Sequence, residues 1–119
     1  MADLDAFFAL TESAKEVGAA VATGIVRTHD ALFLESGFAH DGVAERIRPW
    51  QELGVLATDN EVATMYTVGS ILQMKTGAVL VAVDNLATGE SIDFETQYDK
   101  LIADAIEVGT RALAKLIRG

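Results

Sequence analysis

The sequence predicts an α/β fold, with about three mostly parallel strands flanked by helices. Segments with helical and strand patterns alternate along the chain, which is typical of layered α/β domains. Residues 78–83 are apolar at every position, as expected of a strand that is covered on both faces. Residues 94–118 carry apolar side chains at helical spacing, and this pattern predicts a long amphipathic helix.

The first half of the chain predicts two helices and one strand. Asp3 is suited to cap the first helix and Gly18 to end it. Residues 20–28 are rich in β-branched and apolar residues and predict a strand. A short helix is expected over about 41–53, with a break or kink at Pro49. The apolar positions of the first helix at helical spacing are Leu4, Phe7, Phe8, Thr11, Ala14 and Val17.

The second half predicts two strands and two helices. A short buried strand over 54–58 precedes a helix over 61–74, and Gly77 is expected to end that helix. The strand over 78–83 leads into a loop over 84–93. The final helix has one apolar face, made of Tyr98, Leu101, Ile102, Ala105, Val108, Gly109, Ala112, Leu113 and Leu116.

Composition restricts the class of protein. A chain of 119 residues is expected to form one domain, over 1–119. Half of the residues are hydrophobic and one is proline, so a packed core is expected. The sequence has no cysteine, which excludes disulfides and thiolate metal sites and suits a cytoplasmic location. A net charge of −9 repels phosphate backbones, so we expect no nucleic-acid partner.

The sequence also predicts no membrane partner. The longest apolar run near a strand covers residues 77–83, which is far too short to span a bilayer. The first residues include Asp3 and Asp5 and lack the positive charge of a signal peptide.

Polar residues follow each predicted strand, at 28–30 (Thr-His-Asp), 59–61 (Asp-Asn-Glu) and 84–85 (Asp-Asn). Ligands of open α/β sheets bind at the carboxyl ends of the strands, so these three clusters are candidates for one shared site. Their carboxylates could accept hydrogen bonds from sugar hydroxyls, act as a general acid, or hold a hard cation such as Mg²⁺.

Each acid also has a structural interpretation. Asp59 is placed to cap the following helix, Glu61 is a first-turn acid favoured by the helix dipole, and Asp84 is a turn residue. His29 and His40 lack the spacing of a metal-binding pair, so no metal site is expected. A Ser-His-Asp triad is discounted, because the sequence contains no nucleophile elbow.

Three segments carry a resemblance to a known family. Residues 54–68 have the sequence GVLATDNEVATMYTV, residues 75–90 have KTGAVLVAVDNLATGE, and residues 24–33 have GIVRTHDALF. The first resembles the signature of the nucleoside phosphorylases that include bacterial purine and uridine phosphorylases, where a strand enters acid-Met-Glu and a small-residue helix. The second resembles the following strand and catalytic loop, and the third the strand leading to the base pocket. The resemblance implies a three-layer phosphorylase-like fold, of which this chain forms the C-terminal half.

The resemblance implies roles for individual residues. Glu61 matches the glutamate that holds the ribose hydroxyls, and Asp84 matches the aspartate that acts as general acid toward the base in the purine enzymes. Phe33 is similar to the aromatic residue that packs on the base, and Asp59 lies at the first acid of the motif. These roles suit glycosidic bond cleavage, because a carboxylate stabilises charge on the ribose and an acid protonates the leaving base.

Two departures from the family pattern leave two hypotheses. Asn60 stands where the family has methionine under the ribose. The glycine-rich loop and arginines that bind phosphate belong to the family's first half, which has no counterpart here. The first hypothesis is half of a pentosyltransferase, with a nucleoside substrate, phosphate as co-substrate and no cofactor. The other half would be a separate N-terminal-half chain, or this chain would be the tail of a longer native protein. The second is a non-catalytic oligomeric relic or nucleoside-binding domain. Both hypotheses predict self-association, because a second copy would cover an exposed apolar edge strand.

The presence of Asp84 favours a purine nucleoside over uridine as the substrate.

Overall fold

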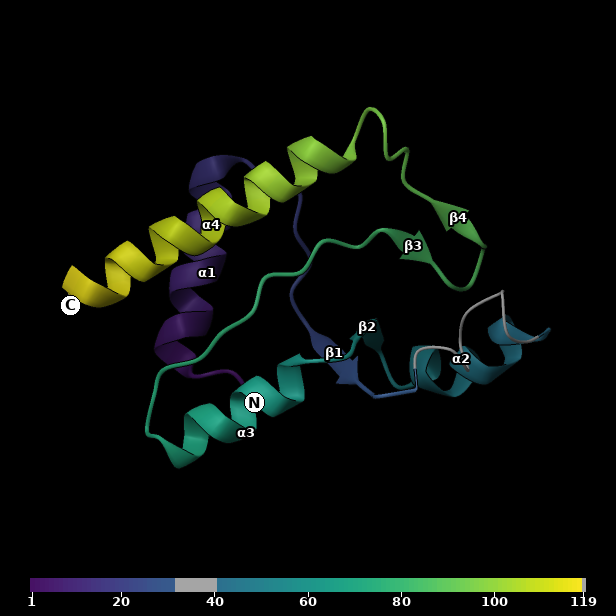
Figure 1. The fold of residues 1–119 in the computed structure, drawn as a ribbon, viewed down its shortest axis with the longest axis horizontal. Coiled ribbons are helices and arrows are strands. Elements are labelled where there is room, and N and C mark those ends of the chain that lie inside the picture. Colours follow the sequence, from purple (N-terminus) through teal and green to yellow (C-terminus); the bar gives the residue numbers. More distant parts are fainter. Residues whose placement is uncertain (32–40, 119) are drawn as a thin grey trace.

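The computed structural model describes residues 1–31 and 41–118, and its four helices in these ranges accompany small sheets. The predicted α/β class is therefore confirmed. In chain order (Figure 1), the elements are α1 (Leu4–Val17), β1 (Ile25–Thr28), α2 (Val43–Glu52), β2 (Val55–Asp59), α3 (Val62–Ile71), β3 (Asp84–Asn85), β4 (Glu90–Ser91) and α4 (Tyr98–Arg118).

Strands β1 and β2 form a parallel pair, as the alternating pattern predicts. Thr28 lies opposite Asp59 in the register, so the carboxyl ends of both strands meet at one edge. The backbone amide of His29 extends the pairing by donating to the Asp59 carbonyl at 3.0 Å. Strand β1 is shorter than the strand predicted over 20–28, because only the last four of these residues pair with β2.

Residues 78–83 do not form the predicted third strand. In the described chain β1 and β2 make one two-stranded sheet, and β3 pairs with β4 in a separate antiparallel one. The apolar pattern of 78–83 suits a strand with neighbours, but a strand forms only where another backbone supplies hydrogen bonds. Residues 78–83 belong to neither sheet of the described residues. At the end of this segment the Ile92 amide donates to the Val83 carbonyl at 2.9 Å, next to the β3–β4 pair.

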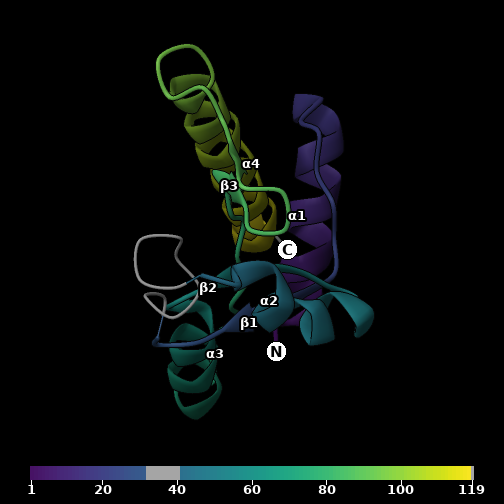
Figure 2. The same cartoon turned by 90° about the vertical axis from the view of Figure 1, so that its right-hand side faces the viewer.

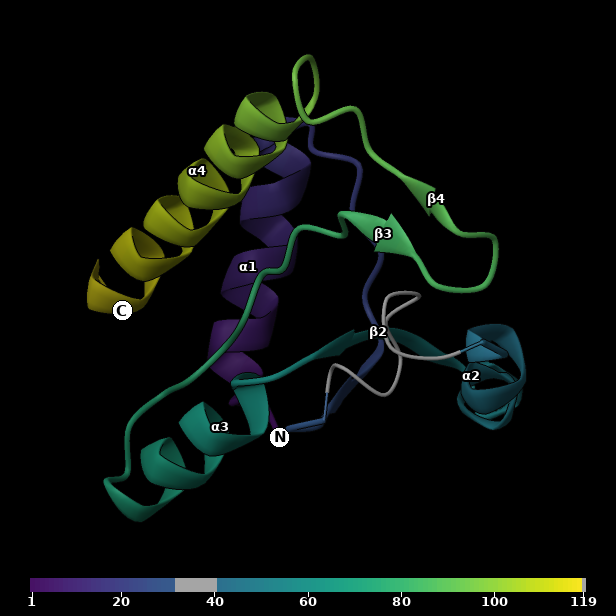
Figure 3. The ribbon, with the colours of Figure 1, turned by 45° about the vertical axis from the view of Figure 1, so that its right-hand side comes forward.

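Helices α1 and α4 pack side by side and contain most of the buried residues (Figures 2 and 3). Small side chains at the contact let the two helix backbones approach closely. Of the predicted apolar face of α1, only Ala14 is fully buried, whereas Phe7 and Phe8 are exposed. The spacing of these positions predicts the helix, which is confirmed; the small residues of α1, and not the large ones, pack against α4. The buried residues of the pair are Ala6, Ala9, Ser13, Ala14, Val108 and Ala112.

Local cap signals at α1 are confirmed. The Asp3 carboxylate accepts hydrogen bonds from the amides of Asp5 and Ala6, at 3.0 and 3.1 Å. Gly18 ends the helix in the left-handed conformation, with φ of 74°. Such a φ is strained for residues with a Cβ atom and favours glycine.

The predicted break at Pro49 and the predicted helix end at Gly77 are wrong. Helix α2 continues through Pro49, which lies in its last turn. Helix α3 ends at Ile71, before Gly77, through a turn in which Gln73 adopts a φ of 55°. Gly77 instead passes close to α1: a Cβ atom there would lie 2.8 Å from Leu10 Cδ1. Its small size allows residues 74–83 to cross this helix.

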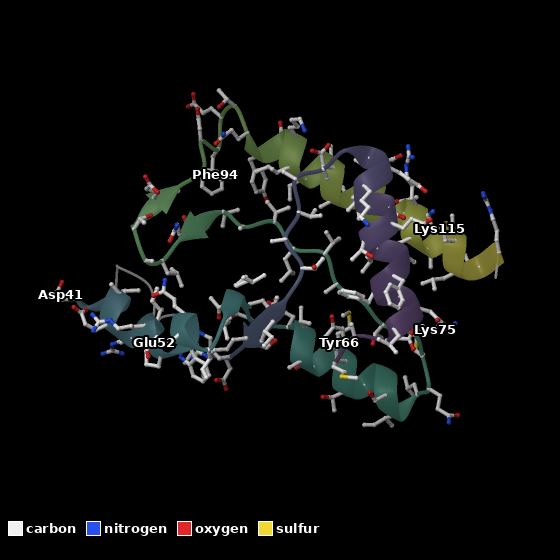
Figure 4. The ribbon with its side chains drawn as sticks, turned by 180° about the vertical axis from the view of Figure 1, so that it is seen from behind. Asp41, Glu52, Tyr66, Lys75, Phe94 and Lys115 are labelled. Carbon is white, nitrogen blue, oxygen red and sulfur yellow. The ribbon has the colours of Figure 1, made fainter. Side chains whose placement is uncertain are left out.

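Exposed ion pairs border the α1–α4 contact. The Lys115 ammonium, labelled in Figure 4, lies 3.0 Å from a Glu12 carboxylate oxygen and 2.7 Å from one of Glu16. Exposed pairs of this kind contribute about 0–1 kcal/mol each. Apolar packing therefore supplies most of the stability of this contact. None of the described helices has the length and apolarity needed to cross a membrane.

Ser13 gives a stability prediction. Its side chain is 0% exposed, and its hydroxyl has no hydrogen-bond partner in the described part of the chain. Because an unpaired buried hydroxyl costs about 1–3 kcal/mol, we expect Ser13→Ala to raise the free energy of unfolding by about 1 kcal/mol. Urea denaturation followed by circular dichroism measures this. The exposed Ser70→Ala change should leave stability within about 0.5 kcal/mol; a less stable Ser13→Ala protein would contradict the prediction.

Candidate functional site

The carboxyl edge of the β1–β2 pair brings two of the three predicted clusters together. Thr28, the last residue of β1, donates a hydrogen bond from Oγ1 to Asp59 Oδ1 at 2.5 Å. Thr58 also crosses the two strands, because its Oγ1 donates to the Arg27 carbonyl at 3.1 Å. Residues 28–30 and 59–61 therefore lie at the same edge, as the parallel pairing predicts.

The Asp59 carboxylate binds backbone amides at the beginning of α3. Its Oδ2 accepts hydrogen bonds from the amides of Glu61 and Val62, at 3.1 and 2.7 Å. Burial raises the pKa of Asp59, but the hydrogen bonds from Thr28, Val62 and Glu61 outweigh this effect, so the pKa lies below its ordinary value. The side chain is therefore a carboxylate at neutral pH, and both of its oxygens are occupied by protein donors.

The Glu61 carboxylate, unlike that of Asp59, accepts no hydrogen bond from the described residues. It directly precedes α3 and is exposed, as is Asn60 beside it. Within residues 1–31 and 41–118, no hydrogen bond or ion pair engages the Glu61 side chain. A carboxylate with a fixed backbone and free oxygens is suited to accept hydrogen bonds from a ligand with neighbouring hydroxyl groups.

Asp84 lies on the other small sheet. Ser91 Oγ donates to Asp84 Oδ1 at 2.6 Å across the β3–β4 pair. In the following turn Asn85 Oδ1 accepts from the amides of Ala87 and Thr88, at 3.0 and 3.3 Å. Because residues 78–83 do not join the β1–β2 sheet, the expectation that residues 84–85 share its edge was wrong for the described chain; Figure 3 shows this hairpin and β2 as separate elements.

The remaining candidates are placed as follows. Phe33 and His40 lie outside the described residues. His29 Nδ1 accepts a hydrogen bond from the Ala31 amide at 3.3 Å. In the part of the chain that the structure describes, no group of three or more His, Cys, Asp or Glu residues is arranged to hold a metal ion.

Sequence reasoning missed two features beside the site. Thr28 was one member of a polar cluster, and no local signal showed that it bonds Asp59, which is 31 residues away. The Arg27 guanidinium lies 4.4 Å from the centre of the Trp50 ring, a cation–π contact that joins β1 to α2. Neither contact has a periodicity or spacing that a sequence pattern would reveal.

Comparison with known proteins agrees with the sequence motifs. Residues 2–118 match the model of the phosphorylase superfamily. A DeoD-type purine nucleoside phosphorylase of Clostridium novyi (strain NT) is 30% identical over 78 residues, which are 63% of this chain and 34% of that protein. The chain thus covers about a third of the length of this curated relative. No solved structure matches significantly. Because the family match includes nearly every residue, the chain belongs to the phosphorylase superfamily.

Proposed function

We propose that this chain binds the ribose and base of a nucleoside, and that it cleaves the glycosidic bond with phosphate when another polypeptide segment supplies the phosphate site. The observation that carries this proposal is the free carboxylate of Glu61 at the β1–β2 edge, beside an Asp59 carboxylate whose oxygens are occupied. The similar curated protein is a purine nucleoside phosphorylase, which supports a nucleoside as the ligand.

In this proposal each candidate has one task. Glu61 accepts hydrogen bonds from the ribose hydroxyls, and Asn60 and Phe33 line the sugar and base positions. Asp59 fixes the turn that carries Glu61. A phosphate oxygen attacks the anomeric carbon, the glycosidic bond breaks, and Asp84 protonates the leaving base. A general acid next to the base favours purines, and phosphate is the co-substrate with no further cofactor.

The proposal also includes a polypeptide partner. The extended segment 78–83 and α4 form an open groove of about 390 Å³, with apolar lining residues that include Leu80, Ile102 and Ile106. Leu80 is 44% exposed and Ile106 64%. A second copy, or a chain with the N-terminal half of the fold, would supply strand hydrogen bonds to 78–83 and complete the three-layer fold. A sequence without cysteine suits a cytoplasmic location for this assembly.

The test follows release of free base from inosine and, separately, from uridine, with and without phosphate. Phosphate-dependent release from inosine supports the full proposal. Binding of inosine without release favours the alternative, a non-catalytic nucleoside-binding domain, which the place of Asp84 in a different sheet from β1 and β2 supports. Absence of any binding would overturn both. Light scattering on the same sample gives the mass of the assembly.

Glu61→Ala tests the ribose contact directly. A hydrogen bond to a charged group contributes about 1.5–3 kcal/mol, so loss of the carboxylate should raise the Kd for inosine by about tenfold to a hundredfold. Isothermal titration calorimetry measures the Kd. Glu52→Ala, which removes an exposed glutamate from the end of α2, is the matched control and should leave the Kd unchanged. Equal Kd values for Glu61→Ala and wild type would remove Glu61 from the site.

A further inference from the structure

We propose that Thr28 is a positioning residue, which acts through Asp59 to hold the turn of Asn60 and Glu61 in the place where the Glu61 carboxylate meets the ribose hydroxyls. This inference rests on the proposed function of Glu61. It assigns a specific role to Thr28 of β1, which the sequence marks only as one member of the polar cluster at 28–30.

The Thr28 hydroxyl connects three elements. Its Oγ1 donates to Asp59 Oδ1 on β2 at 2.5 Å, and it accepts from the amide of Ala63, in the first turn of α3, at 3.1 Å. A hydroxyl group has one hydrogen to donate and two lone pairs to accept with, so one atom makes both contacts. Amides in the first turn of a helix have no partner within the helix, and Thr28 supplies one to Ala63.

The connection continues from Asp59 to Glu61. While one oxygen of the Asp59 carboxylate accepts from Thr28, the other accepts from the amides of Glu61 and Val62. The bond from Thr28 therefore fixes the rotation of the carboxylate, and this rotation fixes the amide of Glu61. Since a sheet of two strands is marginally stable, side-chain bonds across the β1–β2 edge have a large share in holding this geometry.

Three variants separate this role from general support of the strands. Thr28→Val keeps the shape and the β-branched character of the side chain but removes the hydroxyl. Thr28→Ser keeps the hydroxyl and should restore the wild-type behaviour. Thr58→Val is the matched control, because its hydroxyl crosses the same two strands to the Arg27 carbonyl without contacting Asp59.

The first measurement is amide hydrogen exchange by NMR in the absence of ligand. We expect Thr28→Val to accelerate exchange of the amides of Glu61, Val62 and Ala63, while Thr28→Ser and Thr58→Val leave these rates near those of wild type. Removal of the Thr28 bond should also raise the pKa of Asp59, because that bond lowers it. Unchanged exchange at all three amides in Thr28→Val would overturn the link from Thr28 to the turn.

The second measurement is inosine binding. Small misplacements of a binding group are costly, so Thr28→Val should raise the Kd by about tenfold, while Thr28→Ser and Thr58→Val stay within about twofold. Accelerated exchange with an unchanged Kd would show that Thr28 only supports the helix, and would overturn the positioning role. If the wild-type chain does not bind inosine, the proposed function fails, and the exchange comparison alone then decides whether Thr28 holds the turn.

Discussion

Replacing Asp84 by asparagine should lower the rate of phosphate-dependent base release from inosine by about 10²- to 10⁴-fold, the usual contribution of a positioned general acid. The amide has nearly the size of the carboxyl group and still accepts the hydrogen bond from Ser91 Oγ. It cannot transfer a proton to the leaving base. The measurement is kcat in the assembly that releases base, together with the Kd for inosine, which should change little because the lost interaction belongs to the transition state.

Two comparisons make the Asp84 result specific. Asp99→Asn removes another exposed acid, in the first turn of α4, and should leave kcat within about twofold if surface charge is irrelevant to the reaction. A nucleoside whose base already carries a positive charge, such as 7-methylinosine, needs less protonation to leave. Asp84→Asn should therefore lose much less activity on this substrate than on inosine. An equal loss on both substrates would contradict the role as general acid.

The properties of single residues predicted those features of the fold that depend only on residues nearby in the sequence. The cap at Asp3 and the left-handed end at Gly18 follow from the properties of single residues. The third strand depends on a backbone far away in sequence, and an apolar pattern at 78–83 carries no information about whether that backbone is present. Helical periodicity marked the apolar positions of α1 and predicted the helix, but it does not show which of these positions contact α4.

The candidate site likewise has parts that the sequence predicts and parts that only the structure shows. Strand ends and parallel pairing were sufficient to place residues 28–30 and 59–61 at one edge. The two acids of the second cluster looked alike in sequence, and only the hydrogen bonds distinguish them. Asp59 has both carboxylate oxygens occupied, whereas Glu61 is bound only through its backbone within the described residues. The contribution of Thr28 depends on contacts 31 and 35 residues away in sequence, which no spacing rule reveals.

The helix pair α1–α4 gives the prediction with the largest effect on stability. Val108 is 1% exposed and lies on α4 at the contact with the small residues of α1. An unpaired carboxylate buried there costs several kcal/mol, so Val108→Asp should lower the free energy of unfolding by at least about 4 kcal/mol. Since the stability of a small domain is about 5–15 kcal/mol, the variant should unfold at a much lower urea concentration than the wild type, as followed by circular dichroism at 25 °C.

Ile106→Asp is the matched control for this change, because it introduces the same residue two positions earlier in the same helix. Ile106 is 64% exposed beside the groove with 78–83, so in an isolated chain its replacement should cost less than about 1 kcal/mol. Equal tolerance of both changes would contradict the α1–α4 core. A loss at Ile106 as large as that at Val108 would mean that another polypeptide covers this groove in solution. The pair of variants therefore measures the core and, independently of activity, tests the proposed partner surface.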